Sequence, residues 1–90
     1  MYILEFTNQA VEDLKWLKKT DQIAYNKVQK LLLELIEHPT TGTGKPELKK
    51  YNLSGFYSRR ITHKHRLVYQ INDEMISVLV LSTVGHYGDK

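Results

Sequence analysis

The chain has no cysteine and no long run of apolar residues among its 90 positions. Without cysteine it can form neither disulfide bonds nor thiolate metal sites, which fits a reducing compartment. Because no apolar run approaches the ~20 residues of a membrane span, the sequence predicts no membrane segment. The first residues, Met1 to Glu5, also lack the basic and apolar regions of a secretory signal, so we expect a soluble protein of the cytoplasm.

Clusters of carboxylates are missing as well, which disfavours a site that binds two metal ions. What is present is an ordinary globular composition, with 41% apolar and 26% charged residues. A chain of this length has room for one hydrophobic core, so residues 1–90 are expected to form a single domain. Such a small domain buries a modest fraction of its surface, and a bound partner would stabilise it.

The N-terminal half has the periodicity of a strand followed by two helices. Residues 2–6 are β-prone, and Thr7 has the position of a helix N-cap. Apolar residues at helical spacing then predict a helix to about Lys19, and Thr20–Asp21 is expected to break the chain and cap a second helix. Pro39 should end that helix, because proline disfavours helical geometry in the residue before it. The second helix is predicted to bury one broad stripe: Ile23, Val28, Leu31, Leu32, Leu35 and Ile36.

The C-terminal half changes to the periodicity of strands after a loop that follows the second helix. Residues 56–62 alternate, which puts Arg59 and Arg60 on opposite faces of a strand. Residues 66–71 form a second predicted strand. Residues 75–84 are nearly all apolar and predict a central strand that is buried on both faces.

The predicted order is therefore β-α-α-β-β-β, which is typical of an α+β domain. We expect the helix hairpin to pack on one face of a small, mainly antiparallel sheet. The other face of that sheet would be open to a ligand.

The positive charge is concentrated in residues 45–66, named here the basic segment. It holds a single acid, Glu47, and these cations: Lys45, Lys49, Lys50, Arg59, Arg60, Lys64 and Arg66. A basic surface attracts polyanions, and the phosphate backbone of nucleic acid is the commonest. A lone carboxylate would repel that phosphate, so we expect Glu47 to have a chemical role.

Arg60 and Arg66 flank a tight turn at residues 62–65 on neighbouring predicted strands, where both can lie on the face away from the helices. Arginine presents a planar fork that holds a phosphate with two hydrogen bonds. The alternative is a solvated strand edge whose charge prevents aggregation. The residues alone leave both interpretations open.

Glu47 and His86 are candidates for proton transfer. Surrounding cations keep a carboxylate ionised, so Glu47 could act as a general base beside a bound phosphodiester. His86 follows the last predicted strand and could protonate a leaving oxygen, and Tyr87 offers a face on which a base could stack. The structural alternative makes Glu47 an exposed loop carboxylate and His86–Tyr87 a cover for the sheet edge.

Together with the cations, these side chains supply what RNA cleavage without a metal ion requires. A base takes the proton of the attacking 2′-hydroxyl, an acid protonates the departing 5′-oxygen, and cations stabilise the charge on the phosphate. His63 and His65 would share a face on a strand and form a candidate metal pair. No third ligand is evident nearby and cations surround the pair, so we expect a surface turn, with neither a metal nor a cofactor.

Four motifs occur together in this chain: Gly44-Lys45-Pro46-Glu47, Asn52-Leu53-Ser54-Gly55-Phe56-Tyr57-Ser58-Arg59-Arg60-Ile61-Thr62, His65-Arg66-Leu67-Val68-Tyr69 and Gly85-His86-Tyr87. They resemble the Txe/YoeB family of bacterial toxins, which belongs to the RelE/ParE superfamily. The resemblance covers the whole chain, and the run from Gly44 to Tyr69 is its most specific part.

The resemblance implies a RelE-like fold and an endonuclease that cleaves mRNA in the A site of the 70S ribosome. It assigns the general base to Glu47, the general acid to His86 and the phosphate-stabilising arginine to Arg66. The supporting residues that it implies are Lys50, Arg60 and Tyr87. The implied products are a 2′,3′-cyclic phosphate and a 5′-hydroxyl.

The resemblance also implies a cognate antitoxin, YefM-like and acidic, and a toxin–antitoxin complex that binds operator DNA. An acidic segment that folds on binding can mask an exposed basic surface. Whether the free protein forms a homodimer stays open. Many family members have proline after the glutamate, whereas Leu48 follows Glu47 here, so Lys49 could take the place of Lys50. Because three residues follow Tyr87, a free tyrosine carboxylate cannot be part of this site.

Two other functions are compatible with the sequence. One is a non-enzymatic inhibitor, like the gyrase-poisoning relatives on the same fold, because one fold hosts several functions. The other is a small RNA-binding module of the translation machinery, for which the basic segment and Tyr57 would suffice. The set of Glu47, Arg66 and His86 favours the nuclease, since neither inhibition nor binding needs it.

Overall fold

The computed structural model describes residues 1–42, 47–48 and 56–84 of the chain. Its elements in chain order are β1 (Ile3–Phe6), α1 (Asn8–Thr20), α2 (Gln22–Glu37), β2 (Glu47–Leu48), β3 (Phe56–Arg60), β4 (Arg66–Asn72) and β5 (Ser77–Ser82). The predicted α+β order is confirmed. The structure adds one strand, β2, which is too short to give a periodic signal in the sequence.

Both helices begin at the predicted caps. The side chain of Thr7 accepts a hydrogen bond from the Ala10 amide at 3.0 Å, and Asp21 Oδ1 accepts one from the Ala24 amide at 3.0 Å. These bonds satisfy amides that have no partner within the helix. α2 ends at Glu37, shortly before Pro39, as predicted. None of the described helices is long and apolar enough to cross a membrane.

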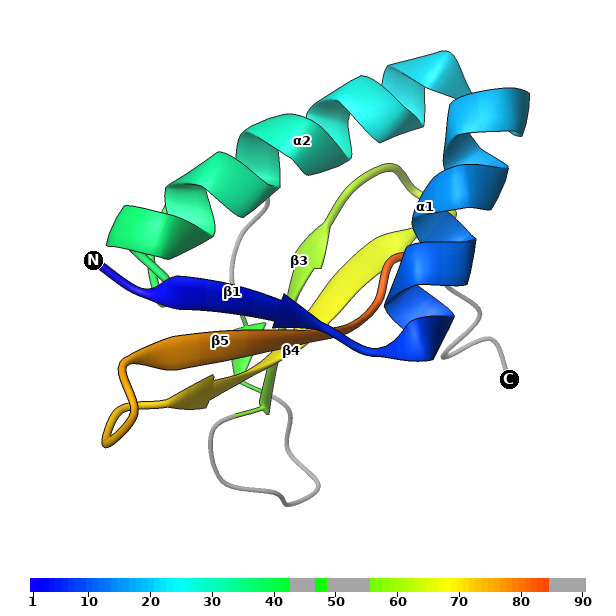
Figure 1. Cartoon of the computed structure of the whole chain (residues 1–90). Coiled ribbons are helices and arrows are strands. Elements are labelled where there is room, and N and C mark those ends of the chain that lie inside the picture. Colours follow the sequence, from blue (N-terminus) through cyan, green and yellow to red (C-terminus); the bar gives the residue numbers. More distant parts are fainter. Residues whose placement is uncertain (43–46, 49–55, 85–90) are drawn as a thin grey trace.

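The sheet has five strands in the order β1-β5-β4-β3-β2. β1 runs parallel to β5, and the other neighbouring strands are antiparallel. Figure 1 shows α1 and α2 on the same side of this sheet. The opposite face has no helix over it among the described residues; Arg60 is exposed on it, whereas Ser58 and Val68 are 1% and 8% exposed.

The hydrophobic core lies between the helices and the sheet. Its fully buried members come from both layers: Ala10, Leu17, Ala24, Val28, Leu31, Leu35, Leu67, Tyr69, Val78 and Val80. Burying one Leu or Val side chain contributes about 1.5–3 kcal/mol. This layer therefore supplies the main stabilisation of the fold.

Two predictions about burial were wrong. Ile23 is 81% exposed, and Ala24, the next residue around the helix, takes the core position. The last strand begins at Ser77, because Met75 belongs to the turn after β4 and is 68% exposed. Leu79 is half-buried, so β5 is fully buried only on the face that the helices cover.

Candidate functional site

Arg60 and Arg66 lie directly opposite each other at one end of the β3–β4 ladder, as the position of the turn predicted. Arg60 is exposed and Arg66 is half-buried. Opposed residues of an antiparallel pair have Cβ atoms about 4.5–5.5 Å apart, and like charges at such positions destabilise the pair. A bound anion would relieve this repulsion, which makes the arginine pair a candidate for phosphate binding.

The short strand β2 brings the backbone of Glu47 to the same sheet. Glu47 pairs with Ser58, Ser58 pairs with Val68, and Val68 pairs with Ser82, so the four positions form one row across the sheet. Ser58 precedes Arg60 by two residues, and residues two apart on a strand share a face about 7 Å apart. The row of position 47 is therefore next to the row of the arginine pair.

Four predicted site residues lie outside the described residues: Lys49, Lys50, His86 and Tyr87. Their roles, and the role of the Glu47 side chain, remain predictions. The described chain reaches Val84, two positions before His86. β5 ends at Ser82, which pairs with Val68 beside an irregularity in the β4–β5 register, and the amides of Thr83 and Val84 then bond to Asp13 of α1 on the helix side.

Arg59 does not belong to the basic surface. It is 0% exposed, and its Nη1 forms an ion pair with Glu34 Oε1 at 3.0 Å. Its Nη2 donates hydrogen bonds to the backbone carbonyls of His38 and Thr41 at 2.5 and 2.7 Å. Gly42, with a φ of +114°, passes so close that a Cβ there would lie 2.6 Å from Glu34 Oε1. Counting Arg59 among the cations that attract a polyanion was wrong, because its charge is neutralised inside the fold.

Tyr69 completes this group of contacts, named here the Arg59 cluster. Its hydroxyl accepts a hydrogen bond from Arg59 Nε at 3.0 Å and donates one to the carbonyl of Pro39 at 2.7 Å. Burial raises the pKa of the Tyr69 hydroxyl above its ordinary value of 10.0, and the hydrogen bond from Arg59 partly opposes that rise. Tyr57 stacks on Tyr69 with ring centroids 5.9 Å apart, so its ring lies on the helix side and not beside Arg60.

His63 and His65 have different surroundings. His63 is exposed, whereas His65 is buried and meets the ring of Trp16 edge-on, with centroids 6.0 Å apart. The prediction of a surface turn was therefore wrong for His65, which packs under α1. In the described part of the chain, no group of three or more His, Cys, Asp or Glu side chains is placed to hold a metal ion.

Asp13 is a buried carboxylate that the sequence analysis missed. It is 7% exposed, and its Oδ2 accepts hydrogen bonds from the amides of Thr83 and Val84 at 2.9 and 3.2 Å. Its Oδ1 accepts a hydrogen bond from Gln9 Nε2 at 2.7 Å. An available signal was the position of this acid, four residues before the buried Leu17 on the same helical stripe.

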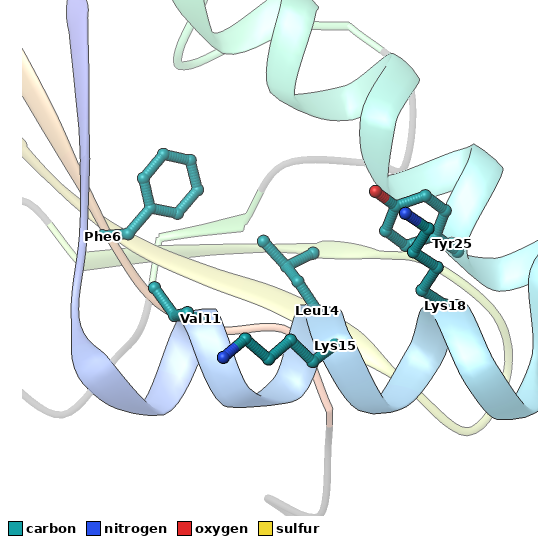
Figure 2. Close-up of a pocket in the computed structure, with 6 residues that line it drawn as sticks. All are labelled: Phe6, Val11, Leu14, Lys15, Lys18 and Tyr25. Carbon is teal, nitrogen blue, oxygen red and sulfur yellow. The ribbon is translucent and has the colours of Figure 1, made fainter.

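A shallow hollow on the helix side of the molecule is separate from the arginine pair. Its volume is about 340 Å³, and it is lined by Phe6, Val11, Leu14, Lys15, Lys18 and Tyr25. Figure 2 shows that these side chains come from β1, α1 and α2, with apolar groups in the middle and the two lysines beside them. The hollow suits an apolar group that carries negative charge nearby.

Comparisons with known proteins agree on one family over nearly the whole chain. The family described as YoeB-like toxin of bacterial type II toxin-antitoxin system matches residues 6–87. Toxin YoeB of Escherichia coli (strain K12) is 39% identical over 84 residues, which make up 93% of this chain and 98% of that protein.

Solved structures that are similar to this chain include members of the same family. The YoeB dimer from Staphylococcus aureus is 39% identical, with a TM-score of 0.84 over 96% of this chain and 98% of that one. A heterotetrameric YoeB–YefM toxin–antitoxin complex from Staphylococcus aureus is 39% identical, with a TM-score of 0.81 over 97% of this chain and 99% of that one. The predicted RelE-like fold is confirmed.

Proposed function

We propose that this chain, which belongs to the family of YoeB-like toxins of bacterial type II toxin–antitoxin systems, is an endoribonuclease that cleaves mRNA in the ribosomal A site. The sheet register is the observation that supports this best, because position 47 lies in the row next to Arg60 and Arg66. In the proposed complex, Glu47 acts on one side of the phosphodiester and the two arginines on the other, the combination that proton abstraction beside a phosphate requires. Cleavage of mRNA on the ribosome stops translation in the cytoplasm.

In the proposed reaction, Glu47 takes the proton of the 2′-hydroxyl while the 2′-oxygen forms a bond to the neighbouring phosphorus. The bond from phosphorus to the 5′-oxygen breaks, and His86 gives that oxygen a proton. Arg66 stabilises the negative charge that develops on the phosphate. The products are a 2′,3′-cyclic phosphate and a 5′-hydroxyl, and both proton transfers use side chains without a metal ion.

The supporting residues hold the RNA around the reacting phosphate. Arg60 and either Lys50 or Lys49 bind neighbouring phosphates of the backbone. Tyr87 stacks on a base or orients the acid. Arg60, directly opposite Arg66, is the supporting residue for which the described structure gives a register position.

The test supplies the purified protein to translating 70S ribosomes in the presence of EDTA, with the mRNA ends mapped afterwards. We expect cleavage in the A site, lowered about 10²–10⁴-fold by Glu47→Gln or by His86→Gln. Cleavage that is unchanged in both variants would remove the catalytic assignment. Intact mRNA combined with inhibited supercoiling by gyrase would favour the non-enzymatic alternative.

We also propose a cognate antitoxin that is YefM-like and acidic. The supporting observation is the YoeB–YefM complex of the Staphylococcus aureus relative, together with the exposed positive charge of this chain. The antitoxin folds on binding and masks the basic surface, and the complex binds operator DNA. Co-expression with the product of the adjacent gene should yield a stable complex, whereas a toxin tolerated without any partner would contradict the proposal.

A further inference from the structure

The turn between β3 and β4, residues 61–65, connects the arginine pair with the helices. Arg60 and Arg66 stand at its two ends, opposite each other in the ladder. On the helix side, Lys27 of α2 donates a hydrogen bond from Nζ to the Ile61 carbonyl at 3.3 Å. Figure 1 shows the chain between β3 and β4 curving toward α1. The turn therefore brings the two arginines close to residues of the helix layer.

Trp16 of α1 is an exposed aromatic side chain beside this turn. Its ring meets the buried ring of His65 edge-on, with centroids 6.0 Å apart, and yet 49% of the residue is exposed to solvent. The contact with His65 fixes the position of the indole without covering it. A flat ring that is held in place and still exposed is suited to stack on an unpaired base.

Positive charge surrounds this ring on the side of the turn. Between Arg60 and Arg66 the sequence adds Lys64, which is exposed, and it contains no acid. We name the following residues the basic strip: Trp16, Lys27, Arg60, Lys64 and Arg66. In the described part of the chain, the four cations of the strip form no ion pair with a carboxylate, whereas Arg59 does. Their charges are therefore available to phosphates.

We propose that the basic strip binds single-stranded mRNA next to the scissile phosphate, with a base stacked on Trp16 and with Lys27 and Lys64 at phosphates. The inference rests on the proposed function, because it takes the RNA at the arginine pair to be mRNA. Stacking favours an unpaired strand, since a double helix is contacted through its groove and its phosphates. The strip begins at the arginine pair, so the next nucleotides of the same strand are the first to reach it.

The first experiment measures binding without the ribosome. Trp16 is the one tryptophan of the chain, so its fluorescence reports a stacked base directly. The probe is a 2′-O-methyl RNA of about 10 nucleotides, which is within the usual site size for single strands and has no free 2′-hydroxyl for cleavage. We expect this strand to quench the fluorescence, and the same strand in a duplex to quench it less. In anisotropy titrations with labelled RNA, Trp16→Leu should bind about 5- to 100-fold more weakly.

The dependence on salt tests the lysines. Each phosphate contact with a single strand adds about 0.7 to the slope of log K against log salt, so Lys64→Gln and Lys27→Gln should each lower the slope by about that amount. The matched control is Lys30→Gln, which removes an exposed charge from α2 outside the strip. It should leave the slope unchanged.

The control for the aromatic change is Tyr2→Leu. The Tyr2 hydroxyl bonds to Asp73 at 2.9 Å, beyond the end of β4 that lies away from Arg66, so this variant should bind RNA as the wild-type protein does. Circular dichroism establishes that each variant is folded. Leucine keeps an apolar group against His65. If Trp16→Leu is nevertheless unfolded, Lys64→Gln replaces it in the next comparison.

The second experiment identifies the RNA that the strip contacts. Programmed ribosomes carry either a long mRNA or one that ends directly after the codon in the A site. We expect Trp16→Leu to slow cleavage of the long mRNA more than cleavage of the short one, because the short mRNA lacks the nucleotides that reach the strip. An equal loss on both would assign the contact to ribosomal RNA and overturn the inference.

The remaining outcomes separate this inference from the proposed function. If the wild-type protein cleaves neither mRNA, the proposed function fails, and the assignment of the strip to mRNA fails with it. If the wild-type protein cleaves mRNA, but RNA leaves the Trp16 fluorescence unchanged and the variants bind as tightly as the wild type, the inference alone is overturned.

Discussion

Arg59 and Arg60 are consecutive residues of β3, yet they belong to two different regions of the molecule. Arg59 is fully buried on the helix side, where it makes an ion pair with Glu34 and hydrogen bonds to two backbone carbonyls. Arg60 is exposed on the other face, opposite Arg66. Two consecutive arginines therefore differ in role. Arg59 joins the helix layer to the sheet, and Arg60 can bind an anion on the other face.

The role of a charged side chain in this protein is set by the groups that surround it. The guanidinium of Arg59 has acceptors from α2, from the segment after α2 and from β4, so its charge is compensated inside the fold. Arg60 instead faces a like charge, an arrangement that destabilises the ladder unless an anion is present. The stability of the fold depends on Arg59, and the proposed binding of RNA involves Arg60.

The largest expected effect comes from removing the buried arginine. Arg59→Met removes the ion pair with Glu34, whose side chain is 25% exposed, and removes the donor to the Tyr69 hydroxyl and to two backbone carbonyl groups, so we expect a total cost of about 3–5 kcal/mol. The free energy of unfolding, measured by urea denaturation, should fall by about that amount. For a domain of this size the thermal midpoint falls about 4–8 °C per kcal/mol.

The matched variant is Arg60→Met on the same strand. Its side chain is exposed, so the free energy of unfolding should change by about 0.5 kcal/mol or less. Adding Glu34→Gln to Arg59→Met should restore part of the loss, because the carboxylate is then no longer left without its cation. Equal losses for Arg59→Met and Arg60→Met would abolish the distinction between the two regions.

Much of the fold could be predicted from local sequence, because its signals are local. The caps at Thr7 and Asp21 and the end of α2 before Pro39 each depend on a few neighbouring residues. Strand alternation also put Arg59 and Arg60 on opposite faces. What alternation could not supply was the partner of Arg59, since Glu34 is 25 residues away and only the folded chain brings the two together.

Of the candidate site, too, only the part with local signals could be predicted from the sequence. The tight turn predicted that Arg60 and Arg66 lie on neighbouring strands, and the register confirms it. The strand at Glu47 is two residues long, too short for any periodicity to indicate. Asp13 was missed because an acid on a helix is usually a solvated surface residue, and its contacts with residues 83 and 84 exist only in the folded chain.

The second expected effect has opposite signs for stability and for activity. Arg60→Gln removes the repulsion between two opposed cations, so the free energy of unfolding should stay constant or rise by about 0.2–1 kcal/mol. Cleavage of mRNA on ribosomes should fall about 10-fold, because a charge-assisted hydrogen bond to phosphate contributes about 1.5–3 kcal/mol. The cleavage of mRNA by Arg66→Gln should fall about 10²–10³-fold, as expected for the loss of a group that stabilises the developing charge.

Salt provides the control for this second prediction. Added phosphate should stabilise the wild-type protein against urea more than it stabilises Arg60→Gln, because the anion neutralises the opposed pair. Arg59→Met should respond to phosphate as the wild-type protein does, since Arg59 lies on the other side of the sheet. A loss of stability in Arg60→Gln, with cleavage unchanged, would make the exposed arginine a structural residue.

The last expected effect concerns the two stacked tyrosines on the helix side. Burial raises the pKa of Tyr69 above 10.0, so the folded state holds the phenolic proton more tightly than the unfolded state does. The resulting stabilisation is complete below pH 10 and is lost as the pH rises from about 10 through the folded pKa. Tyr69→Phe removes this pH dependence, and it also costs about 1–3 kcal/mol near neutral pH because the Pro39 carbonyl and Arg59 Nε lose a hydrogen-bond partner.

Tyr57→Phe is the matched change, because it alters the same kind of ring in the same stack. Urea unfolding at about pH 8 and about pH 11 should show a similar alkaline loss of stability in the wild-type protein and in Tyr57→Phe, and a smaller loss in Tyr69→Phe. An alkaline loss that survives in Tyr69→Phe but disappears in Tyr57→Phe would place the titrating group outside the Arg59 cluster. In that case, Glu34 and the backbone carbonyl groups alone would compensate the buried charge of Arg59.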